Sequence, residues 1–186
     1  MIEFFKNLDG DILLWIQEFI RNPILTPFFK FITHLGDSGL IWIATSIALL
    51  IHKKTRKVGI LCITALLGSL IVNNLILKNI VARIRPYEVV NGLNLLIQKQ
   101  VDLSFPSGHT GASFAAAVTI YQCLNKKRYG IIALILAFLI GFSRLYVGVH
   151  YPTDVLTGLF TGTLISILVV ATNKRYNILD KIKFFN

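Results

Sequence analysis

Residues 58–77 read VGILCITALLGSLIVNNLIL, a run of 20 residues without one charged side chain. About 20 apolar residues are enough for one α-helix to cross the hydrocarbon core of a bilayer. The whole chain of 186 residues shares this character, being 54% hydrophobic and 15% charged with a mean hydropathy of +0.67. Soluble globular domains average about 45–50% apolar and about 25% charged residues. The composition therefore excludes that class and predicts an integral membrane protein.

Four more apolar segments flank this run, and they lie at about 40–51, 110–124, 131–149 and 155–172. Several are shorter than the roughly 20 residues that a straight span needs, and the segment at 110–124 is rich in small residues. Small residues let helix backbones approach inside a bundle, so the G-x-x-x-G pair at Gly158 and Gly162 is interpreted as packing within the chain. We therefore predict an all-α, polytopic transmembrane helical bundle of five to six spans.

The net charge of +10 is concentrated in a few places along the sequence. Eleven of the 19 lysines and arginines, with one of the 9 acidic residues, lie in the segments 52–57, 125–128 and 173–186. These segments are alternate connections between the predicted spans, and the positive-inside rule places such connections in the cytoplasm. The N-terminus and the other connections then face outward. In a soluble protein, the same excess of basic residues would suggest a nucleic-acid partner. Here the orientation in the membrane explains the excess, so we expect no nucleic-acid partner.

Residues 1–21 carry apolar side chains at helical spacing with several charged residues between them. The charges are too many for a span, so we predict an amphipathic helix that lies on the membrane. Trp15 and Trp42 are expected as anchors at the membrane interface. The predicted organisation is an amphipathic interfacial segment at 1–35, a transmembrane helical domain that carries the chemistry at 36–175, and a cytoplasmic tail at 176–186.

Three polar clusters fall at the predicted outward ends of the spans, namely KNIVARIRP at 78–86, PSGH at 106–109 and SRLYVGVHYPTD at 143–154. Lys78 and Arg85 are about two helical turns apart and can share one face. Arg144 lies near the membrane interior, where a guanidinium is costly unless it pairs with an anion. Ser107 and Gly108 open a helix whose free backbone N–H groups can bind an anion. Together the clusters predict a phosphate site.

Two histidines and one carboxylate complete the clusters. His150 and Asp154 share a helix face if the helix begins at the intervening proline. Asp154 can then accept the Nδ1–H of His150 and leave Nε2 as a nucleophile, while His109, from another helix, can move a proton. Arg83, inside the first cluster, is expected to contact the surface or a lipid headgroup. The connection at 87–105 is expected to form a short interfacial helix, with a lid that reads the headgroup as the alternative.

The three clusters resemble the K-x6-R-P, P-S-G-H and S-R-x5-H-x3-D signatures of the type 2 phosphatidic acid phosphatase superfamily. That family includes membrane lipid phosphatases and vanadium haloperoxidases. The resemblance implies that His150 attacks phosphorus and becomes phosphohistidine, that Asp154 orients it, and that His109 protonates the leaving oxygen. It also implies which groups hold the phosphoryl oxygens: Lys78, Arg85, Ser107, the Gly108 backbone and Arg144.

The expected enzyme is a lipid phosphatase of the outer leaflet of a bacterial plasma membrane, a multi-pass protein whose active site faces outward. Its partners would be the bilayer and a phosphorylated membrane lipid, of which undecaprenyl pyrophosphate is the first candidate. Phosphatidylglycerophosphate and phosphatidate are alternatives. We expect neither a cofactor nor a metal ion, because three cations can supply the positive charge. Rival readings are a vanadate-dependent haloperoxidase and a non-catalytic lipid-binding or transport relative. The sequence predicts no oligomeric state.

Overall fold

The computed structural model describes residues 2–179, with side chains from residue 8 onward. All regular structure within these residues is helical, as predicted. Most of the predicted tail at 176–186 lies outside the described residues.

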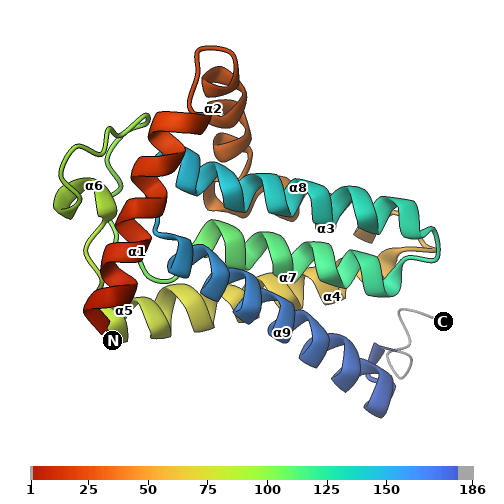
Figure 1. Ribbon diagram of the computed structural model, residues 1–186. Coiled ribbons are helices and arrows are strands. Elements are labelled where there is room, and N and C mark those ends of the chain that lie inside the picture. The colour runs from red at the N-terminus through yellow and green to blue at the C-terminus, as the bar shows by residue number, and fades with distance from the viewer. Residues whose placement is uncertain (1, 180–186) are drawn as a thin grey trace.

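Five long helical stretches form the bundle (Figure 1). They are α3 (Leu40–Ile51), α4 (Arg56–Ser69) with its continuation through η3 (Leu70–Leu77) and α5 (Lys78–Val81), α7 (Gly108–Cys123), α8 (Lys127–Tyr146) and α9 (Pro152–Tyr176). Helix α7 lies at the centre and contacts the other four. Its position follows from its composition, since the run of alanines at 115–117 is fully buried and allows close approach on several sides.

The glycine pair on α9 packs against α7. A Cβ atom at Gly162 would lie 2.3 Å from the backbone oxygen of Gly111, and one at Gly158 would lie 2.6 Å from that of Ser107. Any larger side chain would push the two helices apart. The interpretation of this motif as packing within the chain is therefore confirmed.

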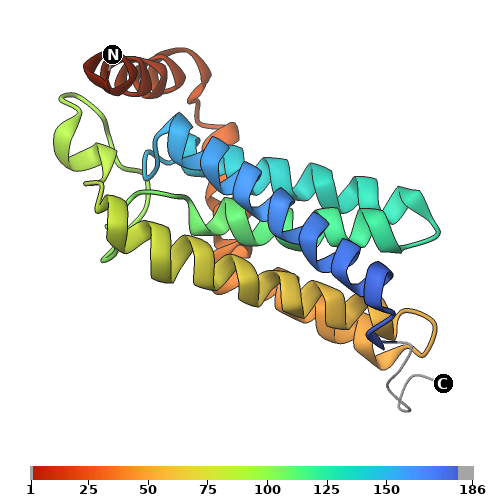
Figure 2. The ribbon, with the colours of Figure 1, turned by 90° about the horizontal axis from the view of Figure 1, so that it is seen from below.

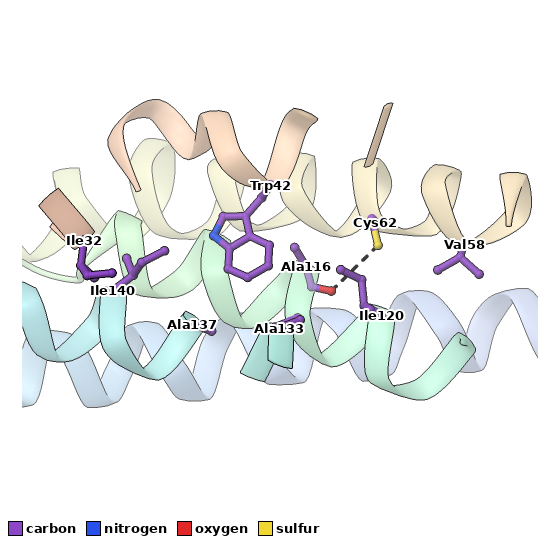
Figure 3. Packing of buried hydrophobic residues seen from close by; sticks show 10 residues of the cluster. Ile32, Trp42, Val58, Cys62, Ala116, Ile120, Ala133, Ala137 and Ile140 are labelled. Atoms are coloured by element: carbon purple, nitrogen blue, oxygen red, sulfur yellow. Dashed lines mark hydrogen bonds between the residues drawn. The ribbon is translucent and has the colours of Figure 1, made fainter. Parts of the chain in front are cut away.

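The apolar core lies between α3, α4, α7 and α8, where Figure 3 shows Trp42 packed beside Ala116 and Ile140. The prediction that Trp42 anchors the membrane interface is wrong. Its side chain is buried, and its indole Nε1 donates a hydrogen bond of 2.8 Å to Ser113 Oγ on α7. The buried indole N–H therefore has a hydrogen-bond acceptor, and the small side chains of α7 let the indole come close enough to reach it.

Three helical stretches are long and apolar enough to cross a membrane: Arg56–Val89, Lys127–Tyr146 and Pro152–Tyr176. A fourth follows if α2 (Leu25–Leu35) and the stretch Asp37–Ile51, bent by 49° at their junction, form one broken span. The chain is a multi-pass membrane protein, but the predicted count of five to six spans is not confirmed. The count falls short because α7 has only 16 residues, fewer than the roughly 20 that a straight helix needs to cross the bilayer.

The N-terminal helix α1 (Ile2–Trp15) and its continuation η1 (Ile16–Ile20) lie across one end of the bundle (Figures 1 and 2). Leu13 and Ile16 are buried against the bundle, whereas Trp15 and Phe19 are exposed. The short helix α6 (Pro86–Val89) lies at the same end, and the three basic segments lie at the other end as far as the structure describes them. The two ends therefore differ in charge in the way that the sequence predicts.

Candidate active site

Six of the eight predicted site residues line one cavity of about 620 Å³ at the end of the bundle that α1 crosses. They come from α5, α7, α8 and the connections next to them, and they are Lys78, Arg85, Gly108, His109, Arg144 and His150. The fold thus brings together three clusters that are far apart in the sequence. Asp154 and Ser107 stand behind the wall of the cavity.

The cavity continues from these polar groups into an apolar channel between α3 and the α4–η3 helix. Its walls there are the side chains of Ile43, Ile47, Ile63, Leu66, Leu67 and Leu70. A ligand that fills the cavity must therefore be charged at one end and apolar at the other.

Lys78 and Arg85 both donate to one carboxylate, that of Asp102. Lys78 Nζ pairs with Oδ2 and Arg85 Nη2 with Oδ1, and Arg85 Nε also donates to the Asp102 backbone oxygen at 3.0 Å. Burial raises the pKa of Asp102, but the Lys78 hydrogen bond and the Arg85 charge outweigh it and bring the pKa to about 2. Sequence reasoning missed Asp102, although it is the one acidic residue between Glu88 and Asp154. It bridges the two cations as an anionic ligand would.

Arg144 is 1% exposed and incompletely paired. Its Nη1 donates to Thr33 Oγ1 at 2.5 Å, whereas its Nε and Nη2 atoms have no hydrogen-bond partner among the described residues. A buried donor without an acceptor costs about 1–3 kcal/mol, and more when it is charged. An anion in the cavity would supply the missing acceptors.

The partners of His150 fix its tautomer. Arg85 Nη1 lies 3.0 Å from His150 Nε2, and because arginine can only donate, Nε2 must carry a lone pair. The proton then sits on Nδ1, which is 3.4 Å from Asp154 Oδ2. Burial lowers the pKa of His150 well below its usual value, and the charges of Arg85 and Arg144 lower it further. His150 is thus a neutral imidazole whose Nε2 can act as a nucleophile.

Asp154 is fully buried and held from several sides. Its Oδ2 accepts hydrogen bonds from Ser104 Oγ at 2.5 Å and from the Tyr151 backbone N–H at 3.0 Å. Its Oδ1 accepts from Arg83 Nη1 at 2.8 Å. These bonds orient the carboxylate toward His150 and leave it little freedom.

Arg83 belongs to this support, so the prediction that it contacts the surface or a headgroup is wrong. Its guanidinium lies 3.6 Å over the Tyr151 ring, and its Nη2 donates to Asp9 Oδ2 at 2.7 Å. Asp9 is buried on α1 and also accepts from the Thr153 backbone N–H at 3.1 Å. Arg83 therefore links the N-terminal helix to the carboxylate behind His150.

The second histidine has a carboxylate partner of its own. His109 Nε2 lies 3.0 Å from Asp37 Oδ1, which belongs to the turn before α3.

Ser107 begins α7 as its N-cap, and its hydroxyl accepts from Thr110 Oγ1 at 2.9 Å and from the Thr110 N–H at 3.4 Å. The Ser107 N–H donates to the Asp154 backbone oxygen at 3.1 Å, which joins the second cluster to the third.

The connection at 87–105 is helical only at its start, where the short helix expected from the sequence corresponds to α6 (Pro86–Val89). It is irregular elsewhere and is tied to the bundle, for example by the Leu96 N–H, which donates to Val147 O at 3.2 Å. This path delivers Asp102 and Ser104 to the site. No short-range pattern could have predicted either contact, because the partners lie 17 to 50 residues away.

The comparisons with known proteins agree with the motifs. A family model described as the PAP2 superfamily matches residues 57–178. The undecaprenyl-diphosphatase of Sulfolobus acidocaldarius is 38% identical over 130 residues, and the match spans 70% of this chain but only 62% of that protein.

Two solved structures share the fold. The crystal structure of Aquifex aeolicus LpxE has a TM-score of 0.76 at 30% identity, covering 87% of this chain and 93% of that one. That of a transmembrane PAP2 type phosphatidylglycerolphosphate phosphatase from Bacillus subtilis has a TM-score of 0.74 at 30% identity, covering 91% and 86%. The chain therefore belongs to the PAP2 superfamily, the family that its three motifs predict.

Proposed function

We propose that this protein is a metal-independent lipid phosphatase that removes the terminal phosphate of a membrane lipid, with undecaprenyl pyrophosphate as the first candidate substrate. The observation that carries the proposal is the cavity itself. Three cations and two histidines line one end, and six aliphatic side chains line the other. A phosphorylated lipid has this distribution of charge and apolar surface, and the relative from Sulfolobus acidocaldarius points to a polyprenyl diphosphate.

In the first half of the reaction, His150 Nε2 attacks the phosphorus atom and the bond to the leaving oxygen breaks. Arg85, which now donates to Nε2, turns to a phosphoryl oxygen and frees the lone pair. His109 donates a proton to the leaving oxygen. The Nε and Nη2 atoms of Arg144, which have no partner in the described part of the chain, and the ammonium group of Lys78 stabilise the negative charge, which is the main task in phosphoryl transfer.

In the second half, His109 takes a proton from a water molecule, whose oxygen attacks the phosphorus of phosphohistidine. The bond between phosphorus and His150 Nε2 breaks, and inorganic phosphate leaves. Asp154 accepts the Nδ1–H of His150 throughout and stabilises the imidazole as its charge changes. Ser107 and the Gly108 backbone, at the first turn of α7, contribute further donors to the phosphoryl group.

Asp102 has a defined place in this cycle. Its carboxylate holds Lys78 and Arg85 in position while the cavity contains no phosphate. An incoming phosphoryl group competes for the same two cations and displaces it. Binding therefore exchanges one anion for another, and the two cations are never left without a partner.

The proposed topology places the site in the outer leaflet of a bacterial plasma membrane. The basic segments lie at the end of the bundle opposite the cavity, which supports a cytoplasmic position for that end. The helices α3, α7, α8 and α9 and the α4–η3 stretch run side by side between the two ends, which supports five crossings despite the short α7. The exposed apolar face of α1 and η1 supports an interfacial N-terminal segment.

The deciding experiment measures phosphate release from a panel of lipids by purified protein in detergent with excess chelator. The panel contains undecaprenyl pyrophosphate, phosphatidylglycerophosphate and phosphatidate, and His150→Ala serves as the inactive reference. We expect release by the wild type alone, fastest from the pyrophosphate. Equal rates of phosphate release by the wild type and His150→Ala would exclude the proposed phosphatase activity. The protein would then be a non-catalytic lipid-binding relative. A loss of activity in chelator would contradict metal independence.

A further inference from the structure

The turn at residues 36–39, between α2 and α3, lies against the second histidine and has no part in the function proposed above. It contains Asp37, whose two carboxylate oxygens have different partners. Oδ1 lies 3.0 Å from His109 Nε2 and Oδ2 lies 2.8 Å from His34 Nδ1. An ionised carboxylate only accepts hydrogen bonds, so both histidine nitrogens donate to it.

The backbone of the turn is shaped around the imidazole of His109. A Cβ atom at Gly36 would lie 2.8 Å from His109 Cδ2 and 2.8 Å from Ile140 Cγ2, so only glycine leaves room for the ring. Ser38 and Gly39 follow with φ values of 52° and 67°, in the left-handed region that non-glycine residues rarely adopt. Three successive backbone features thus place one carboxylate beside one ring nitrogen.

The other charged groups that face His109 are cationic. Arg85 approaches from the segment after α5 and Arg144 from α8, while the uncharged ring of His150 lies on the connection before α9. His34, on α2, faces Asp37 rather than His109. Asp37 is the one anion among these described neighbours, so it alone favours the protonated form of His109 that a general acid needs.

We propose that Asp37 is the positioning residue of His109: it holds the ring by Nε2, favours the protonated form of the ring against the nearby cations, and leaves Nδ1 to exchange the proton with the substrate. This inference rests on the proposed function. In the acid step the Nδ1 proton passes to the leaving oxygen, and in the hydrolysis step Nδ1 takes a proton from the attacking water. His34 fixes the second oxygen of Asp37 and so limits rotation of its carboxylate.

The test compares the pH dependence of kcat/KM for wild type, Asp37→Asn and Asp11→Asn. This parameter covers the steps up to phosphohistidine, in which His109 acts as the acid. Asparagine keeps the size of the side chain but removes its charge, so the alkaline limb should move to lower pH by about one unit. Activity at the alkaline end should fall about tenfold more than at the acidic end. Asp11, exposed on α1, is the matched control and should leave the profile unchanged.

The possible outcomes separate the two proposals. If wild type releases no more phosphate than His150→Ala, the proposed function fails. If wild type is active but Asp37→Asn lowers kcat/KM equally at every pH, or leaves it unchanged, the positioning role fails and Asp37 is only a structural residue of the turn. His34→Ala provides a second measurement, and we expect it to lower kcat severalfold without moving the alkaline limb. A limb that moves as far in His34→Ala as in Asp37→Asn would overturn the assignment to Asp37.

Discussion

The molecule contains two histidine–carboxylate pairs that differ in almost every physical respect. The carboxylate of the His150–Asp154 pair is fully buried and has three further donors around it. That of the His109–Asp37 pair is 47% exposed and is shared with His34 at the surface. The tautomers are also opposite, because Asp154 accepts from Nδ1 and Asp37 from Nε2.

This difference matches the two tasks that we propose. A nucleophile reacts along one direction and benefits from a rigid, dry setting that keeps its lone pair aligned. An acid–base group must gain and lose a proton in every cycle, so a partner in contact with water suits it. Burial of the carboxylate, more than the presence of the pair, therefore distinguishes the two proposed roles.

The largest expected effect comes from Asp154→Asn. Asparagine can orient its amide the wrong way round and can neither fix the Nδ1–H tautomer nor stabilise a positive ring, so we expect kcat to fall by about 10³–10⁴-fold. The measurement compares kcat for phosphate release by Asp154→Asn with kcat for Asp37→Asn at one neutral pH. Circular dichroism verifies that both variants fold. If Asp37→Asn loses as much activity as Asp154→Asn, the distinction between the two pairs is wrong.

The sequence predicted one pair and missed the other for a physical reason. His150 and Asp154 are four residues apart, and helical geometry turns that spacing into proximity. His109 and Asp37 are 72 residues apart, and only the packing of α7 against the turn after α2 joins them. Asp102 and Ser104 were missed for the same reason, since they lie on an irregular connection without periodicity.

The all-helical fold could be predicted because apolar runs determine spans locally, whereas interior contacts depend on which faces meet. Trp42 illustrates the limit. An isolated tryptophan near the end of an apolar segment is typical of the membrane interface. Its burial here depends on Ser113, 71 residues later, which offers a hydrogen-bond acceptor to the indole.

Arg83 tests whether the support behind Asp154 contributes to its rigidity. Arg83→Ala removes a hydrogen bond to Asp154 and separates it from Asp9 on α1. Because small displacements of a reacting group can cost about 10²-fold, we expect kcat to fall by roughly 10- to 100-fold with KM nearly constant. If Arg83→Ala has a normal kcat and a raised KM, the result would instead support the headgroup contact that the sequence predicted for Arg83.

The pH profile of the wild type tests the environment of His150 itself. Burial, Arg85 and Arg144 lower its pKa below the ordinary value of about 6.5, so the neutral, nucleophilic form persists to lower pH. The acidic limb of kcat/KM should therefore lie below that value, and activity at about one pH unit beneath it should exceed that of an ordinary histidine by several-fold. A limb that begins near the ordinary value would show that His150 is better solvated than its burial indicates, and the contrast with His109 would weaken.

The smallest expected effect concerns Asp102, which competes with the substrate for Lys78 and Arg85. Asp102→Asn removes the competing charge, so the substrate no longer has to displace a carboxylate from two cations. Because its side chain is 48% exposed, solvent screens the pair, and partly exposed ion pairs contribute about 0–1 kcal/mol. We expect KM to fall by up to about fivefold while kcat stays within about twofold, measured with one lipid at fixed detergent concentration. A raised KM would mean that Asp102 holds the two cations in their binding geometry more than it competes for them.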